Sequence, residues 1–273
     1  MPKFKLLTVG NPKIAKSVKF GYLTAVLHLA PGSLSGFNVC PKATAGCLAA
    51  CLNTAGRGGI TTGKGRITHA DLTAGTRTNA IQAARVRKTR AYFADRGAFM
   101  ATLADDIRKL VAWAKQLELK VAVRLNGTSD IPWERITVGL SGNIMDHFPA
   151  VQFYDYTKRH NRYDLPANYR LTFSLADGND DDAFWALRGG MNVAAVFHKV
   201  PKAYRLPKTR DRTAGGEGAG AGYTATHGWF GNVQEFEVID GDEHDLRFLD
   251  KPGVIVGLKA KGNAKRDTSG FVR

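Results

Sequence analysis

The chain of 273 residues has no long apolar run. No stretch approaches the roughly 20 apolar residues that a membrane-crossing helix needs. The basic N-terminal stretch is interrupted at Gly10, Asn11 and Pro12, before it reaches the 7–15 apolar residues, roughly, of a signal-peptide core. We therefore expect a cytoplasmic protein that does not act at a membrane.

Cysteine is scarce, and its distribution is unusual. The three cysteines are an odd number, and all lie between Cys40 and Cys51. A secreted scaffold held by disulfides would spread an even number of cysteines along the chain, so this class is excluded. The hydrophobic content of 44% and the charged content of 23% are those of a folded globular protein.

Acidic residues are few relative to basic ones. The chain has 24 Asp and Glu against 39 Lys and Arg, which gives a net charge of +15. Such an excess favours an anionic partner, and nucleic acid is the first candidate. We predict a nucleic-acid patch at Arg205, Lys208 and Arg210. A basic surface that only keeps the protein in solution is the alternative.

Apolar runs and amphipathic stretches alternate along the chain. Three stretches predict helices, at Thr78–Tyr92, Ala98–Leu117 and Asp180–Arg188. Seven short runs predict strands: Tyr22–Ala30, Lys120–Leu125, Ala150–Tyr156, Arg170–Leu175, Asn192–His198, Phe236–Ile239 and Gly253–Leu258. Most of these runs are apolar on both faces, which is typical of parallel strands covered by helices.

This alternation predicts the α/β class. We expect one domain over residues 1–273, a full or partial (β/α) barrel with a cysteine loop after the first strand. Residues 201–235 are rich in Gly, Lys, Arg and Thr, and we expect a mobile loop there.

Polar side chains follow most of the predicted strands. In parallel α/β folds the loops after the strands carry function, although loops are commonly polar for solvation alone. The residues predicted to line a substrate or cofactor pocket at these strand ends are Arg124, Asn126, Ser129, Asp130, Asp155, Lys158, Ser174, Lys259 and Lys261.

The cysteines have the spacing C-x6-C-x3-C. Cys47 and Cys51 would share one face of a helix, and Cys40 would arrive from the end of the first strand. Three thiolates suit a four-iron, four-sulfur (4Fe-4S) cluster, whose fourth iron is then left for another ligand. Zinc bound by three Cys and one His is the rival, with His28 and His69 nearest in the sequence, but zinc sites usually have tighter spacing. Reduced buried thiols are the third reading.

The fourth iron has three candidate ligands in the chain. The strand-end rule brings Asp130, Asp155 and His198 to the mouth of the barrel. The imidazole of His198 is the best chemical match among them. We favour an iron that is open or bound by an exogenous molecule, because metal sites that perform chemistry keep an open position.

The motifs also resemble known proteins. Residues 37–41 (FNVCP) with Cys47 and Cys51, residues 124–130 (RLNGTSD) and residues 257–262 (GLKAKG) resemble the phage-encoded gene product 88 family of uncharacterised proteins. This resemblance covers nearly the whole chain and implies expression in a host bacterial cytoplasm. A three-cysteine loop after the first strand of a barrel more loosely resembles the radical S-adenosylmethionine enzymes. Their C-x3-C-x2-C spacing differs, and the resemblance implies S-adenosylmethionine as a cofactor.

The sequence therefore predicts an iron–sulfur protein with its cluster at Cys40, Cys47 and Cys51. It is either an enzyme whose open iron binds S-adenosylmethionine or a substrate, or a non-catalytic redox or sensor protein. In the second case the basic patches would bind nucleic acid.

Overall fold

The computed structural model describes residues 2–9, 16–61, 65–139, 141–207 and 233–273. Its nine strands form one sheet in the order β1-β2-β3-β4-β5-β6-β9-β8-β7. The strands are β1 Leu7–Thr8, β2 Tyr22–Leu27, β3 Lys120–Arg124, β4 Gln152–Thr157, β5 Tyr169–Ser174, β6 Val193–Phe197, β7 Ala203–Pro207, β8 Val233–Asp240 and β9 Ile255–Lys259.

The centre of the sheet is parallel and its two edges are antiparallel. Strands β2 to β6, β9 and β8 pair in parallel, whereas β1 runs antiparallel to β2 and β7 antiparallel to β8. Within the described residues, the outermost strands β1 and β7 each pair with a single neighbour, so the sheet is not closed. The fold is a mixed α/β fold with a mostly parallel sheet, and the seven predicted strands are confirmed.

The helices of the described chain vary in length. The α-helices are α2 Ala45–Ala49, α3 His69–Ala74, α4 Ala80–Ala94, α5 Arg96–Gln116, α6 Ile144–His147 and α7 Asp180–Arg188. The short 3-10 helices are η1 Leu52–Thr54, η2 Gly56–Gly59, η3 Trp133–Arg135, η4 Arg247–Leu249 and η5 Gly262–Arg266. The three predicted helices correspond to α4, α5 and α7. None of the described helices is long and apolar enough to cross a membrane.

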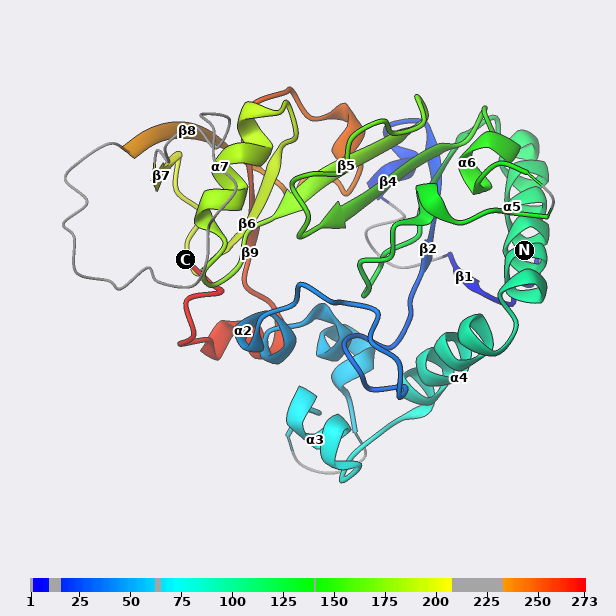
Figure 1. Cartoon of the computed structure of the whole chain (residues 1–273), viewed down its shortest axis with the longest axis horizontal. Helices are drawn as coiled ribbons and strands as arrows, with labels where there is room; N and C mark the ends of the chain where they lie inside the picture. Colours follow the sequence, from blue (N-terminus) through cyan, green and yellow to red (C-terminus); the bar gives the residue numbers. More distant parts are fainter. Residues whose placement is uncertain (1, 10–15, 62–64, 140, 208–232) are drawn as a thin grey trace, which may run out of the picture.

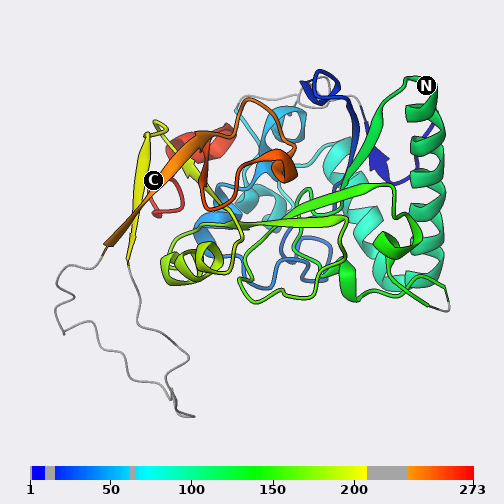
Figure 2. The ribbon, with the colours of Figure 1, turned by 90° about the horizontal axis from the view of Figure 1, so that it is seen from above.

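Helix α5 builds the larger part of the core. Asp95 caps its N-terminus by accepting a hydrogen bond from the Ala98 amide at 2.9 Å. Its apolar positions Phe99, Leu103 and Ile107 recur at helical spacing and are buried against β2, β3 and β4. Each such side chain contributes about 1.5–3 kcal/mol when fully buried. Figure 2 shows α5 at one end of the molecule, with β7 and β8 at the other.

The other face of the sheet is covered by the chain between β8 and β9. Leu246 and Phe248 pack there against Ala122 and Tyr154, which alternate with the residues facing α5. The two faces of β3 and β4 are therefore both buried, as their apolar sequences predict.

Strands β1 and β7 were absent from the sequence prediction, whereas β8 extends the predicted run Phe236–Ile239. Residues 203–207 and 233–240 form an antiparallel pair, so both ends of the loop predicted at 201–235 are strands. Residues 208–232 lie outside the described residues. The alternating exposure along β8 fits a half-solvated strand. Strand β1 is held from outside its own segment, because the Asp106 carboxylate accepts hydrogen bonds from the amides of Lys5, Leu6 and Leu7.

Candidate functional site

The cysteine segment, residues 39–61 with 65–67, lies across the carboxyl ends of the parallel strands. The Val39 carbonyl accepts a hydrogen bond from the Asp130 amide, after β3, at 2.8 Å. The Thr44 hydroxyl donates to the side chain of Asp177, after β5. The Asn263 amide nitrogen, after β9, donates to Thr54 at 3.0 Å. The segment therefore connects loops that follow three different strands, and Figure 1 shows α2 beside the C-terminal part of the chain.

Each cysteine comes from a different local structure. Cys47 lies in α2, whose N-cap Thr44 accepts a hydrogen bond from the Cys47 amide at 3.0 Å. Cys51 caps η1, and its Sγ accepts from the Asn53 amide at 3.4 Å. The Cys40 thiol donates to the Thr128 carbonyl, after β3, at 3.7 Å. All three thiols are free.

Cys47 and Cys51 do not share a helix face, contrary to the sequence expectation. Helix α2 ends at Ala49, and the extended ψ of 136° at Cys51 turns the chain out of the helix. The buried Asn53 accounts for this turn, because its side chain donates to Gln82 of α4 at 2.8 Å. A contact with a distant helix thus fixes the conformation here.

The three thiols influence one another and two nearby cations. Burial, with a contribution from the neighbouring Cys51 and Cys47, raises the pKa of Cys40 to about 12. Burial likewise raises the pKa of Cys51 to about 11, an effect opposed by the charges of Arg85 and Lys158. The pKa of Cys47 is raised by burial and lowered by Lys158. The site is therefore a group of neighbouring protonated thiols beside a lysine and an arginine.

A tight single-ion geometry is not formed by these groups. Among the residues that the structure describes, no three His, Cys, Asp or Glu side chains are arranged to hold a metal ion. The thiols are neighbours, but the described residues do not arrange them as ligands of a single ion.

The structure brings three predicted pocket residues to this site. The Lys158 ammonium donates to the Ser174 hydroxyl at 3.0 Å and lies 5.5 Å from the centre of the Phe271 ring. The Lys158 amide donates to Asp130 Oδ2 at 2.9 Å. Asp130, Lys158 and Ser174 thus connect the ends of β3, β4 and β5 beside the cysteines.

The three candidates for a fourth ligand lie in different surroundings. Asp130 is buried, and its Oδ1 has no hydrogen-bond partner although Arg162 lies 3.6 Å away. Asp155 is fully buried, and both its oxygens accept hydrogen bonds, from Asn126 and from Tyr169. The side chain of His198 is exposed at the end of β6. Asp130 alone among them is electrostatically coupled to Cys40 and Cys47.

The remaining predicted pocket residues have other partners. Arg124 pairs with Asp245 at 3.3 Å and lies 4.5 Å above the Tyr156 ring. The Ser129 hydroxyl donates to Asn126 Oδ1 at 2.8 Å, within the loop after β3. Lys259 and Lys261 are exposed, and both contact Asp242, after β8. This lysine pair therefore contacts the loop after β8.

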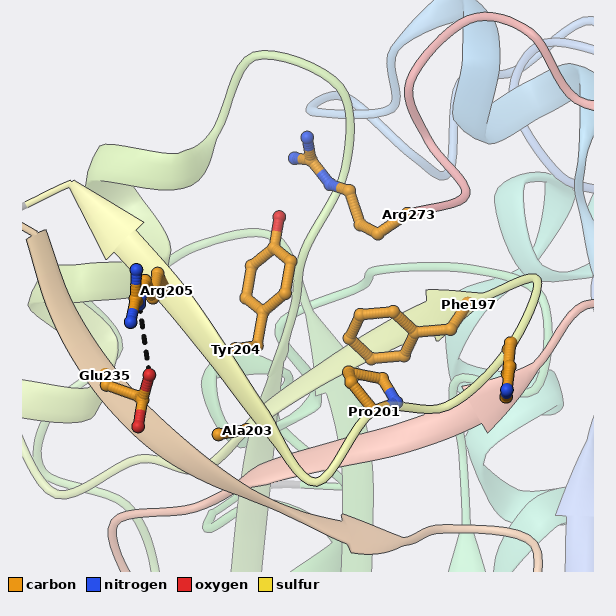
Figure 3. A pocket seen from close by; sticks show the side chains of 8 residues that line it. Phe197, Pro201, Ala203, Tyr204, Arg205, Glu235 and Arg273 are labelled. Carbon is orange, nitrogen blue, oxygen red and sulfur yellow. Dashed lines mark hydrogen bonds and ion pairs between the residues drawn. The ribbon is translucent and has the colours of Figure 1, made fainter.

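The predicted nucleic-acid patch is described only in part. Arg205 on β7 pairs with Glu235 on β8 at 3.0 Å, as Figure 3 shows. Lys208 and Arg210 lie outside the described residues. Beside the ion pair is a pocket of about 460 Å³ whose wall includes Phe197, Tyr204 and Arg273. The Arg205 charge is thus already opposed by a carboxylate.

A second pocket, of about 550 Å³, borders α2 and was missed by sequence reasoning. His69 Nδ1 and Asn263 Oδ1 line it as buried atoms without a hydrogen-bond partner. No motif spacing joins these two residues, which are brought together by the contact between the C-terminal segment and the cysteine segment. In the sequence, only the three cysteines between Cys40 and Cys51 pointed to this region.

One known family matches the chain. The model of the Gene product 88 family matches residues 5–273. The chain belongs to this family. No curated protein and no solved structure matches it. The resemblance to radical S-adenosylmethionine enzymes gains no support from these comparisons. The family match includes the three cysteines and every residue of the site described above.

Proposed function

We propose that this Gene product 88 protein carries a 4Fe-4S cluster bound by Cys40, Cys47 and Cys51. The observation that carries the proposal is that all three thiols of the chain are neighbours at the carboxyl edge of the parallel strands. They arrive there from a strand-end loop, an α-helix and a 3-10 helix. Unrelated structural thiols would not need to meet in this way.

The spacing of the thiols supports a cluster better than zinc. The cysteines are spaced C-x6-C-x3-C, whereas zinc ligands are usually closer together in the sequence. Three thiolates also leave the fourth iron of a cubane for another ligand. Metal ligation also requires thiolates. The ammonium of Lys158 and the guanidinium of Arg85 supply positive charge beside these buried sulfurs.

The fourth iron of the proposed cluster is open to an exogenous ligand. Asp130 is the candidate ligand that is coupled to the cysteines, and it contacts Lys158 and Arg162. His198 is exposed and Asp155 is fully hydrogen-bonded. We therefore favour enzymatic chemistry at an open iron, with S-adenosylmethionine as the first ligand to test. The proposal extends to the setting of a phage protein acting in the cytoplasm of its bacterial host.

The sheet supports the barrel part of the proposal. Strands β2, β3, β4, β5 and β6 follow one another in space in the order of the sequence. A doubly wound sheet reverses its order near the middle, whereas a (β/α) barrel keeps chain order throughout. After β6 the order changes to β9, β8 and β7, so we regard β2 to β6 as the part of the sheet that is like a barrel, with the cysteine segment across the ends of its strands.

Anaerobic reconstitution with iron and sulfide tests the proposed cluster. The wild-type chain should take up about four irons and four sulfides. Replacing Cys40, Cys47 or Cys51 by Ala should remove most of both, because each thiol binds its own iron. Thr73→Ala, an exposed change on α3, is the control and should leave the metal content unchanged. Stoichiometric zinc without sulfide, or iron content that is unaffected by the cysteine variants, would contradict the proposal.

Electron paramagnetic resonance of the reduced protein tests the open iron. Adding S-adenosylmethionine or cyanide should shift the signal of the reconstituted wild-type protein. An unchanged signal with both additions would instead indicate a capped cluster and a non-catalytic redox or sensor role.

A further inference from the structure

Two arginines and a lysine surround His28, close to the cysteine segment. His28 follows β2, and Arg124 ends β3. The register of these strands pairs Val26 with Arg124. Because side chains alternate between the faces of a sheet, Val26, Arg124 and His28 lie on the same face. His28 and Arg124 are therefore diagonal neighbours on adjacent strands, within reach of each other's long side chains.

Helix α4 brings the other two cations to the same place. The Thr89 hydroxyl accepts a hydrogen bond from the Ala30 amide at 2.8 Å, so α4 packs against the chain two residues after His28. Arg85 lies four residues before Thr89, on the same face of the helix, and Lys88 lies one residue before it. These three cations are the charges that act most strongly on His28.

The loop after β3 fixes the imidazole in this position. A Cβ on Gly127 would lie 2.9 Å from His28 Cδ2, so the ring lies directly against the glycine. Burial, together with the charges of Arg85, Arg124 and Lys88, lowers the pKa of His28 to about 3, against the charge of Asp245. The ring is therefore neutral at ordinary pH, and the positive charge around it comes from its neighbours.

The positive charge of this group is only partly balanced. Arg124 has Asp245 as its carboxylate partner at 3.3 Å, yet its Nε is buried without a hydrogen bond. Lys88 donates to the Leu6 carbonyl at 2.9 Å. In the described part of the chain, no carboxylate pairs with Arg85, which donates instead to the carbonyl of Asn53 at 2.7 Å and to its side chain. Like charges that gather in a poorly solvated place favour a bound anion.

Asn53 connects this group to the cysteines. Its carbonyl and side-chain oxygen accept hydrogen bonds from Arg85, and its amide donates to Cys51 Sγ at 3.4 Å. One residue therefore separates the unpaired guanidinium from a cysteine sulfur. A molecule bound by Arg85 would lie beside the site described above.

We propose that Arg85, Arg124 and His28 bind the oxyanion, carboxylate or phosphate, of the small molecule on which the cysteine site acts. The guanidinium fork matches the two oxygens of such a group, and a neutral imidazole donates one further N–H. The assignment of this anion to a substrate rests on the proposed cluster, whereas the binding of the anion does not. The ligand class is thus a small anionic molecule and not a neutral or cationic one.

Titration of the metal-free full-length chain with inorganic phosphate and with succinate tests this inference. Both are added at constant ionic strength, with chloride as the reference ion. Binding is followed by calorimetry and by the nuclear magnetic resonance signals of the His28 ring. The His28→Gln variant lacks these signals and so assigns them. We expect phosphate, succinate or both to bind and to move the His28 signals, while chloride does not. Arg85→Gln and Arg124→Gln should each weaken binding at least tenfold, because each removes one charged donor pair.

The controls separate binding from folding. Arg108→Gln removes an exposed arginine that pairs within α5, and it should bind like the wild type. Arg85→Lys keeps the charge but loses the fork, so it should recover part of the lost affinity. Equal effects of chloride and both oxyanions, or equal binding by the wild-type and Gln variants, would overturn the inference. Because no iron is present, anion binding with failed cluster assembly would leave this inference standing and remove the proposed function.

Discussion

At the scale of single residues, Asp155 and Asn126 hold the loop after β3 in shape. The Asp155 carboxylate accepts hydrogen bonds from the Asn126 amide at 2.6 Å and the Tyr169 hydroxyl at 2.9 Å. Asn126 Oδ1 accepts in turn from Ser129 and from the Trp133 indole at 3.0 Å. This network fixes the loop that presents Thr128 and Asp130 to Cys40. Both residues were predicted to line a pocket, and the structure places both in this hydrogen-bond network.

Asp155 makes stability depend on pH. Burial raises its pKa from 3.8 to about 7, against the hydrogen bonds from Asn126 and Tyr169 and the charge of Arg124. A carboxyl group with a raised pKa binds its proton more tightly in the folded chain. Its contribution to stability is therefore fully present below about pH 4, declines as the pH rises towards about 7, and is lost above that.

Asp155→Asn tests this linkage. The variant cannot ionise at this position. Its free energy of unfolding should therefore rise relative to that of the wild type as the pH rises from about 4 to about 7. Urea unfolding of both proteins at several pH values in this range measures the difference. Parallel stability curves for the two proteins would show that Asp155 does not carry the effect.

At the scale of elements, α2 is fixed by its contacts with the C-terminal segment. Thr44 caps the helix and also bonds to Asp177. Gly46 of α2 is buried so closely that an added Cβ would lie 2.1 Å from Ser269 Oγ and 2.8 Å from Asp177 Oδ1. Only a residue without a side chain allows this approach. The position of Cys47, one residue later, depends on it.

Gly46→Ala should therefore displace α2. We expect a loss of about 1–3 kcal/mol in the free energy of unfolding, the usual cost of overpacking, and a lower iron content after reconstitution. Gly97→Ala is the matched control. Its Cβ meets nothing closer than Asp95 Oδ1 at 3.5 Å in helix α5, so stability should be unchanged or slightly higher. Denaturant unfolding of both variants measures the difference, and equal stabilities would show that α2 tolerates a side chain here.

The elements differ in how far the sequence predicts them. Runs that are apolar on both faces identify most of the seven predicted strands, because burial alone accounts for their composition. Strand β1 has two residues and depends on Asp106, about a hundred positions away, so no local pattern reveals it. Strand β7 has one buried residue, Leu206, and ends at Pro207. The formation of both strands depends on contacts with distant parts of the chain.

The residues of the site also differ in how far the sequence predicts their positions. The strand-end rule brings Asp130, Lys158 and Ser174 together, because parallel strands end at one edge of the sheet. Arg85 and His28 become neighbours only through the packing of α4 against the end of β2. Their sequence separation and the polar composition of α4 give no sign of it. Such packing between elements cannot be inferred from a single sequence.

At the scale of the whole molecule, the cysteine segment fastens separate parts of the chain to one another. It bonds to the loop after β3 through Val39, to the loop after β5 through Thr44, and to the C-terminal segment through Thr54. Its own regular structure is short, with five residues in α2 and three in η1. A segment with little internal structure depends on its external contacts for stability.

A bound cluster should therefore stabilise this segment before the rest of the fold. A ligand that binds only the folded state stabilises it by mass action, and three cysteine bonds would all lie within residues 40–51. Hydrogen exchange followed by mass spectrometry should show slower exchange after reconstitution in the cysteine segment, and also in the loops at 126–130 and 262–269. The buried core between α7 and β6, which contains no residue of the cysteine segment, is the internal reference and should exchange at the same rate with and without iron and sulfide. A uniform slowing over the whole chain would show that the segment and the core open together, and no change in the cysteine segment would contradict ligation by these cysteines.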